Sequence, residues 1–181
     1  ILSYEEITNQ TLETISKTLR PSYQGILIVR KDQNIGAVSI KLIQTKESLT
    51  PISVDKLNLA QSIWKVVGFM PINIDKIENE YPPILKNLEK EVYSLLEELK
   101  RCNLKVLYPL HQSGELLSIL ILGHKEASLP YNTIEQSFIA SIADLASLAL
   151  ARAFLYAEVE EFNQTLQKKV DDATEEIKDK N

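Results

Sequence analysis

Hydrophobic and polar residues follow each other along the chain in patterns that predict a mixture of helices and strands. The first segment begins with a capping box, Ser3 followed by Glu6, and its apolar residues recur at roughly helical spacing, which predicts an amphipathic helix over 3–19. The continuous apolar run 25–29 then predicts a buried strand, and the alternating segment 38–42 predicts a half-buried one. Two strands this close in sequence are expected to pair as an antiparallel hairpin.

A second pair of strands is predicted much further along the chain. Apolar residues dominate 104–110 and 116–122, and a short polar turn at 112–114 separates them. Pro109 cannot donate a hydrogen bond to a neighbouring strand, so we expect a bulge or a locally exposed edge there. The segment 69–74, which a proline interrupts, is a weaker candidate for a fifth strand.

The stretch 54–101 lies between the two hairpins, and its pattern predicts a helical insertion. Residues 55–67 have helical character, and Gly68 follows them as a C-terminal stop. Residues 84–101 place apolar side chains on one face and charged ones on the other, which is typical of an amphipathic helix. Strands and helices together predict an α+β domain.

The last predicted element is a helix that is capped by Asn132 or Thr133 and meets no proline or glycine before the chain ends. At 1.5 Å per residue, its roughly 48 residues would span about 70 Å. The stretch 138–156 is apolar enough to resemble a membrane span, but it contains an aspartate and an arginine. Each charge would cost about 2.5–3.5 kcal/mol at the bilayer centre, so we interpret this stretch as a buried helix without membrane contact.

The second half of this helix carries a narrow apolar stripe with charged residues on both sides. The spacing is mostly that of a heptad repeat, with a stutter around Leu166. We interpret the stripe as the seam of a homodimer with parallel C-terminal helices; the alternative is a solvated helix that lies back on its own domain. The predicted seam residues are Leu148, Leu155, Val159, Phe162, Leu166 and Val170.

The distribution of charge supports a division of the chain into two parts. The 181 residues carry a net charge of −5, and residues 158–181, with eight acidic and four basic side chains, carry −4 of it. We therefore predict a nearly neutral globular domain over 1–157 and a coiled-coil linker over 158–181. The overall acidity argues against a nucleic-acid partner, which would need a concentrated basic face.

The cysteine content and the start of the chain bear on its location. A single cysteine, Cys102, can form no internal disulfide, which fits a reducing cytoplasm. The sequence shows no signal peptide. The chain starts at Ile1 and has one methionine, Met70, so we expect a piece of a longer cytoplasmic protein. A membrane anchor upstream of Ile1 is left open.

The sequence lacks the motifs of common enzymes. It contains no clustered glycines, no G-x-S-x-G elbow, no H-E-x-x-H pair and no zinc-type cysteine cluster. His111 and His124 have no metal-ligand spacing and are expected in turns. Cys102 lies at the C-terminal end of a predicted helix, where a thiolate is disfavoured, so an inert or semi-exposed thiol is expected and its role is left open. We predict neither catalysis nor a metal.

Aromatic and sulfur-containing side chains gather in and near the helical insertion. They are candidates to line a cavity for a small molecule, although apolar residues at such spacing more often belong to a core. The candidate pocket residues are Trp64, Phe69, Met70, Tyr81, Tyr93 and Tyr108.

The second half of the chain resembles a known family. The string VLYPL at 106–110, the turn with Gly114, the strand at 116–123, Pro130 and Tyr131, and the helix ending ALARAFLY at 149–156 resemble the C-terminal half of a GAF domain. The continuation 158–170 resembles the linker that joins such domains to the kinase core of bacterial sensor histidine kinases.

This resemblance implies a PAS-related central antiparallel sheet of about six strands. Terminal helices would cover one face, and a small-molecule cavity would lie on the other, under the helical insertion. The Asn-Lys-Phe signature of cyclic-nucleotide-binding GAF domains is absent, and Cys102 precedes Asn103 where bilin-binding ones usually have a histidine. The ligand or cofactor therefore stays unknown.

The resemblance also implies a function. The chain is expected to be a sensory and dimerisation module of a signal-transduction protein, most readily a two-component sensor histidine kinase with its output domain beyond Asn181. The alternative is the effector-binding GAF domain of a transcriptional regulator, or a small-molecule-binding domain without a kinase.

Overall fold

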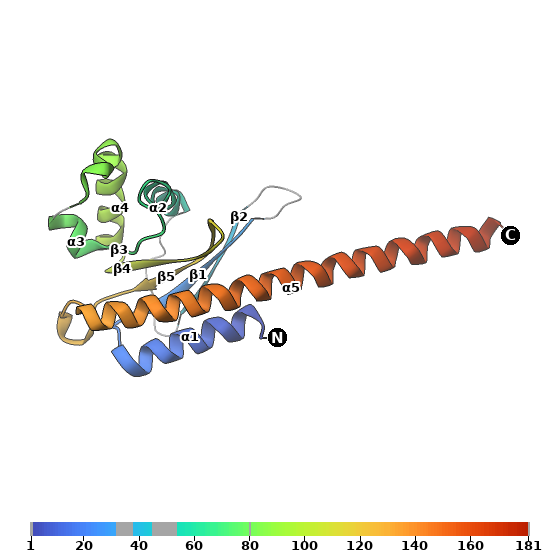
Figure 1. Cartoon of the computed structure of the whole chain (residues 1–181), viewed down its shortest axis with the longest axis horizontal. Coiled ribbons are helices and arrows are strands. Elements are labelled where there is room, and N and C mark those ends of the chain that lie inside the picture. Colours follow the sequence, from blue (N-terminus) through green and yellow to red (C-terminus); the bar gives the residue numbers. More distant parts are fainter. Residues whose placement is uncertain (1, 32–37, 45–53, 80, 181) are drawn as a thin grey trace.

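The computed structural model describes residues 2–31, 38–44, 54–79 and 81–180. It shows an antiparallel sheet with helices on both faces and one long helix that leaves the globular part (Figure 1). The strand order is β2-β1-β5-β4-β3. The strands are β1 (Gln24–Lys31), β2 (Val38–Gln44), β3 (Ile72–Asn73), β4 (Val106–Gln112) and β5 (Glu115–Leu122).

The sheet has fewer strands than the resemblance implies. The described residues form five strands, so the expected number of about six is too high. The reason lies in the segment between the hairpins, where 54–79 and 81–101 are mostly helical and contribute the two-residue strand β3. This short strand confirms the weaker candidate at 69–74.

Both predicted hairpins are present, and they meet in the middle of the sheet. β1 pairs with β2 and with β5, and β5 pairs with β4, all antiparallel. The register of the second hairpin shifts between Leu110 and His111, one residue beyond Pro109. On its other side β4 pairs with β3 at Val106 and Leu107, and no described strand continues beyond that point. The bulge and the open edge expected at Pro109 are therefore both confirmed.

Helix α1 (Tyr4–Leu19) begins at the predicted capping box. The Ser3 hydroxyl accepts a hydrogen bond from the Glu6 amide, and the Glu6 carboxylate accepts one from the Ser3 amide, both at 3.3 Å. The helix ends where Arg20 adopts a left-handed conformation with φ of 48°. Its buried face, which includes Leu12 and Ile15, packs toward the sheet and the start of the long helix.

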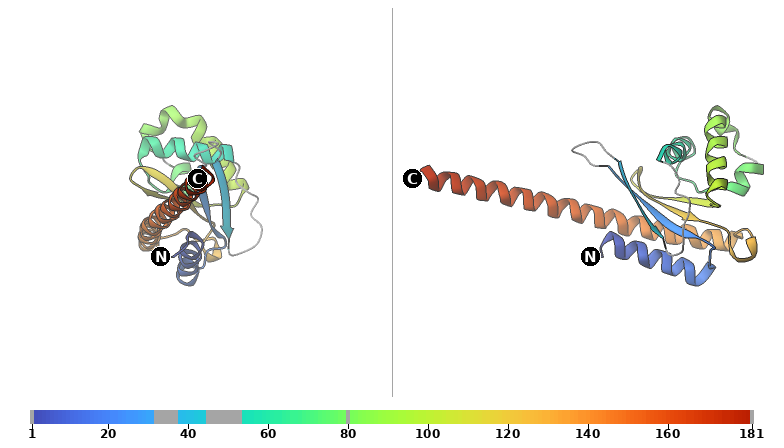
Figure 2. Two further views of the ribbon diagram at one scale, coloured as in Figure 1. Left: turned by 90° about the vertical axis from the view of Figure 1, so that its right-hand side faces the viewer. Right: turned by 180° about the vertical axis from the view of Figure 1, so that it is seen from behind.

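The sheet is buried on both faces. Ile26, Leu120 and Leu122 belong to the core beneath α1 and the long helix. Leu27 and Ile121, which alternate with them, belong to the core beneath the helical insertion. Figure 2 shows these layers from two further directions. A strand that is buried on both sides needs no polar face, which explains the continuous apolar runs in β1 and β5.

The helical insertion covers the second face of the sheet. It consists of α2 (Val54–Val67), α3 (Ile74–Asn79), the 3-10 helix η1 (Pro83–Leu88) and α4 (Glu89–Arg101). Gly68 follows α2 with φ of +76°, as expected of a helix stop. The apolar face of α4 is buried, which confirms the amphipathic pattern predicted for that segment.

The long helix α5 (Thr133–Lys180) has 48 residues. Asn132 and Glu135 form a second capping box. The Glu135 amide donates to the Asn132 side-chain oxygen at 2.8 Å, and the Asn132 amide donates to the Glu135 carboxylate at 2.9 Å. The first half packs on the sheet and on α1, with Ile139 and Leu150 completely buried. Every side chain over 155–180 is exposed, and this part projects away from the globular domain (Figure 1).

By length and composition, α5 could also cross a membrane. Its most apolar 18-residue window has a mean hydropathy of 1.7, and 33% of that window is buried inside the structure. The buried side chains face the sheet, as in the core helix of a globular domain, and the predicted span contains Asp144 and Arg152. These observations support the interpretation of 138–156 as a helix packed on its own domain.

Candidate functional site

Trp64 is the centre of the core beneath the helical insertion. Its side chain is 1% exposed, and its indole N–H donates a hydrogen bond of 2.8 Å to the Met70 carbonyl oxygen. It belongs to the same core cluster as Ile63 and Leu107. The indole therefore holds α2 and the segment that follows it onto the sheet.

The other predicted pocket residues lie in different places. Phe69 stacks on His111 with ring centroids 4.1 Å apart, and Met70 is 62% exposed. Tyr81 and Tyr93 form an edge-to-face pair with centroids 6.3 Å apart. The Tyr81 hydroxyl also donates a hydrogen bond to Glu89 on α4. Neither these four residues nor Trp64 line either of the two cavities described below.

Tyr108 lies on the opposite face of the sheet from Trp64. Its neighbour Leu107 belongs to the core beneath the insertion, whereas Tyr108 is buried in the core beneath α1 and α5. Successive residues of a strand point to opposite faces, so Tyr108 and Trp64 do not share a cavity. Burial raises the pKa of Tyr108 to about 12, because the charged phenolate is disfavoured away from water.

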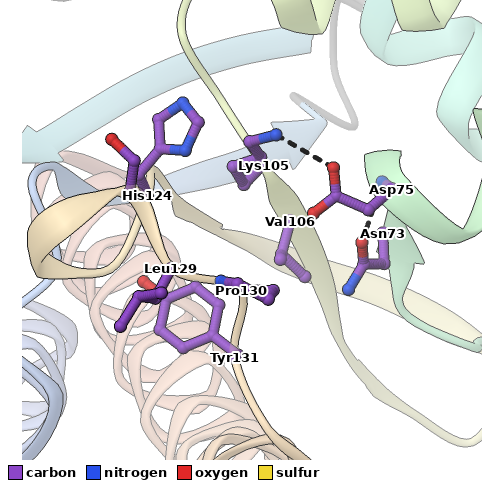
Figure 3. A pocket seen from close by; sticks show the side chains of 9 residues that line it. Asn73, Asp75, Lys105, Val106, His124, Leu129, Pro130 and Tyr131 are labelled. Atoms are coloured by element: carbon purple, nitrogen blue, oxygen red, sulfur yellow. Dashed lines mark hydrogen bonds and ion pairs between the residues drawn. The ribbon is translucent and has the colours of Figure 1, made fainter.

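A polar cavity of about 300 Å³ lies at one end of the sheet (Figure 3). Its walls come from three parts of the fold: the junction of β3 and α3, the start of β4, and the loop from β5 to α5. We call it the polar cavity. It is lined by Asn73, Asp75, Lys105, Val106, His124, Ser128, Leu129, Pro130 and Tyr131.

A second, smaller cavity of about 120 Å³ adjoins the polar cavity. Both cavities are lined by Lys105 and His124, and the smaller one extends to Glu78 and Lys100. Lys100 on α4 and Glu78 on α3 form an ion pair there. Lys105 and His124 thus lie at the boundary between the polar cavity and the smaller cavity.

Three polar contacts fix the walls of the polar cavity. The Lys105 ammonium lies 2.9 Å from a carboxylate oxygen of Asp75, and the amide of Asp75 donates to the side-chain oxygen of Asn73 at 3.0 Å (Figure 3). On the opposite wall, the Tyr131 hydroxyl donates to the Gly123 carbonyl oxygen at 3.0 Å. Burial raises the pKa of Tyr131, because the charged phenolate is disfavoured away from water.

The loop between β5 and α5 contains a short 3-10 segment, η2 (Glu126–Ser128). Ala127 and Ser128 both adopt the left-handed conformation, with φ of 61° and 58°. Such conformations cost non-glycine residues roughly 1–3 kcal/mol each. The loop is therefore held in a strained form next to the polar cavity.

Side chains tie this loop and α3 to the first turn of α5. The Lys125 ammonium lies 2.8 Å from the Glu135 carboxylate, and Lys76 on α3 donates to the side-chain oxygen of Gln136 at 3.1 Å. The hydrogen bond from Lys125, followed by that from the Asn132 amide, lowers the pKa of Glu135. The start of α5 is thus connected both to the sheet and to the insertion.

Gly123 lies directly after β5, at the start of this loop, and packs closely against Ser22 and Tyr23. A Cβ atom there would lie 2.8 Å from the Ser22 hydroxyl oxygen and 3.1 Å from Cβ of Tyr23. Gly123→Ala should therefore lower the free energy of unfolding by about 1–3 kcal/mol, measured by urea denaturation. Adding Ser22→Ala removes the closest contact and should recover part of the loss. An unchanged free energy in Gly123→Ala would contradict the close packing.

The histidines and the cysteine are placed only partly as expected. His111 lies inside β4 rather than in a turn, because the strand continues past the register shift to Gln112. His124 follows β5 in the loop, as predicted. Cys102 is 3% exposed, and burial raises the pKa of its thiol, which fits an unreactive thiol. Among the described residues, no three His, Cys, Asp or Glu side chains converge as a metal site.

The predicted dimer seam is exposed. Leu148, Leu155, Val159, Phe162, Leu166 and Val170 are between 43% and 65% exposed. Leu145 and Ile134, at 64% and 81%, continue the same line of apolar residues toward the start of α5. We call this line the α5 stripe. It leaves a large apolar surface on a helix that already packs against its own domain.

Comparison with known proteins gives a fold but no sequence relative. No protein-family model matches the sequence, and no curated protein matches it. Solved structures do match, and they include GAF domains, one of them from a two-component sensor histidine kinase. The chain has the GAF fold: a central antiparallel sheet, helices on both faces and a long C-terminal helix.

Three of these structures are representative. The GAF3 domain of a Synechocystis protein in its photoproduct state is 13% identical, with a TM-score of 0.58 over 87% of this chain and 99% of that one. The GAF domain of a two-component sensor histidine kinase from Bacillus halodurans is 11% identical, with a TM-score of 0.51 over 87% and 99%. Residues 122 to 287 of a methyl-accepting chemotaxis protein are 19% identical, with a TM-score of 0.54 over 85% and 92%.

Proposed function

We propose that this chain is a sensory and dimerisation module of a cytoplasmic sensor histidine kinase, which relays an input to an output domain through paired α5 helices. The observation that carries the proposal is the exposed α5 stripe on a helix that extends far beyond the globular part of the domain. Similar structures come from a sensor histidine kinase and a chemotaxis protein, which supports a role in signalling. The chain itself would perform no catalysis.

The energetics of the α5 stripe favour pairing. Complete burial of a leucine, valine or phenylalanine side chain contributes about 1.5–3 kcal/mol, and the six predicted seam residues are roughly half exposed in the single chain. Pairing two copies would bury twelve such side chains. That gain is large enough to offset the loss of translational and rotational freedom, which is roughly 4–15 kcal/mol.

The stutter suggests how the paired helices could carry a signal. Around Leu166 the apolar spacing departs from the heptad and locally relaxes left-handed supercoiling. A seam with mismatched periods can adopt two arrangements of similar energy. An input that favours one packing of α5 on its domain would then bias the arrangement of the rod and of the output domain.

Parallel pairing can be tested by disulfide cross-linking. In a parallel dimer the two copies of Val170 face each other across the seam, so Val170→Cys should form an intermolecular disulfide on mild oxidation, seen on a non-reducing gel. Lys168→Cys, on the opposite side of the helix, is the matched control and should cross-link at least tenfold less. Antiparallel pairing would separate the two Val170 positions, and equal cross-linking of both variants would also refute the seam.

The kinase output has its own test. The residues encoded directly after Asn181 should contain a histidine in an H-E-x-x-x-P context, the phosphoacceptor pattern of a histidine kinase. A helix-turn-helix or ATPase pattern at that position would instead support the effector domain of a transcriptional regulator. Either result leaves the dimerisation test unaffected.

A further inference from the structure

Two side chains of the polar cavity, Lys105 and His124, keep hydrogen-bonding capacity that the described contacts of the fold do not satisfy. The Lys105 ammonium has three N–H groups, and its described partner is the Asp75 carboxylate. Among the described residues, the His124 imidazole has no hydrogen-bond or ion-pair partner, although it lines both cavities. The backbone around it is satisfied: the Ser22 amide donates to the His124 carbonyl oxygen, and the Lys105 amide donates to that of Leu122.

The opposite wall of the polar cavity is mostly apolar. Val106 is almost fully buried, Leu129 is 56% exposed, and Pro130 and the ring of Tyr131 complete the wall. Figure 3 shows the Tyr131 ring and Leu129 below the polar groups of Lys105 and Asp75. The cavity therefore has a polar side, where Lys105 and His124 offer hydrogen-bond donors, and an apolar side, a combination that suits a small molecule with one polar end.

The charges of the lining side chains favour a ligand with a single negative charge. The Asp75 carboxylate already balances Lys105, so a multiply charged anion such as phosphate would meet a like charge with too little compensation. A single carboxylate could accept hydrogen bonds from the Lys105 ammonium and from an imidazole N–H of His124. The volume of about 300 Å³ lies at the lower end of the range for ligand pockets.

We propose that the polar cavity binds a small organic carboxylate, with the carboxylate between Lys105 and His124 and the carbon chain against Leu129, Pro130 and Tyr131. This site differs from the cavity under the helical insertion that the family resemblance implies. Its walls are α3, β4 and the strained loop that begins α5. If the proposed signalling function holds, a ligand there would act directly on the start of the output helix.

Binding can be followed by NMR on the isotope-labelled chain at constant ionic strength. We expect sodium butanoate to shift the resonances of His124 and Asn73 with saturation in the millimolar range, whereas butanamide, its uncharged analogue, and sodium chloride should produce no saturating shift. Sodium phosphate should bind at least tenfold more weakly than butanoate. Lys105→Met should weaken butanoate binding at least tenfold, and Lys86→Met, the same change at an exposed remote position, should leave it unchanged.

Several outcomes would overturn the proposal. One is the absence of a saturating shift with acetate, butanoate and benzoate. Another is that phosphate or butanamide produces shifts equal to those with butanoate. The third is that the Lys105→Met chain binds butanoate as tightly as the wild-type chain does. The shifts report binding in monomer and dimer alike. A failure of this site is therefore distinguishable from a failure of the proposed dimerisation, which light scattering and cross-linking measure separately.

Discussion

Val159→Lys combined with Leu166→Lys is expected to convert the chain from a dimer into a folded monomer. Both residues are about half exposed and lie on the projecting part of α5, where every side chain over 155–180 is exposed. A dimer would bury four lysines in its seam and lose four apolar contacts of about 1.5–3 kcal/mol each, so its association constant should fall at least a thousandfold. Light scattering at micromolar concentration would report the mass.

The control for this experiment adds the same charge on the other side of the helix. Ala157→Lys combined with Gln164→Lys places two lysines away from the seam and should leave the dimer intact. The fluorescence of Trp64, buried in the globular domain, should be the same in all three proteins, which shows that the domain is folded. A dimer that survives the seam substitutions would contradict the proposed function.

Trp64→Ala should be the most destabilising single substitution among the predicted pocket residues. The indole is fully buried between α2 and the sheet, and removing a buried tryptophan typically lowers the free energy of unfolding by about 3–5 kcal/mol. Domains of this kind are usually stable by about 5–15 kcal/mol, so the variant should unfold at clearly lower urea concentration. Circular dichroism during urea titration measures this shift.

Met70→Ala is the matched control, because Met70 is 62% exposed and contributes a carbonyl rather than its side chain to the Trp64 hydrogen bond. It should change the free energy of unfolding by less than about 0.5 kcal/mol. A small effect of Trp64→Ala would indicate that the indole lines a hollow rather than fills a core. Equal effects of the two substitutions would contradict the structure.

The periodicity of the sequence predicts the elements well because each carries a local signal. The capping box at Ser3, the hairpin turn at Gly114 and the uninterrupted pattern after Thr133 all correspond to observed boundaries. Pro109 even marks the bulge. These features depend on neighbours within a few residues, which the sequence displays directly.

The positions of the candidate pocket residues were less predictable. In a strand buried on both sides, alternation between apolar and polar residues disappears, so the sequence did not indicate which face Tyr108 would occupy. The polar cavity left no local pattern at all, because Asp75, Lys105 and His124 come from segments far apart in the chain. Only the folded sheet brings them to one end.

The length of α5 has a mechanical consequence. The helix is clamped to the sheet up to Ala153, and the remaining 27 residues to Lys180 extend it by roughly 40 Å. A tilt of about 5° at the clamp would displace the far end by about 3.5 Å, more than the 1–2 Å helix shifts that typically accompany switching at interfaces. The helix thus acts as a lever arm. A change in the packing of its first half that is too small to disturb the sheet would move Lys180 by several ångströms.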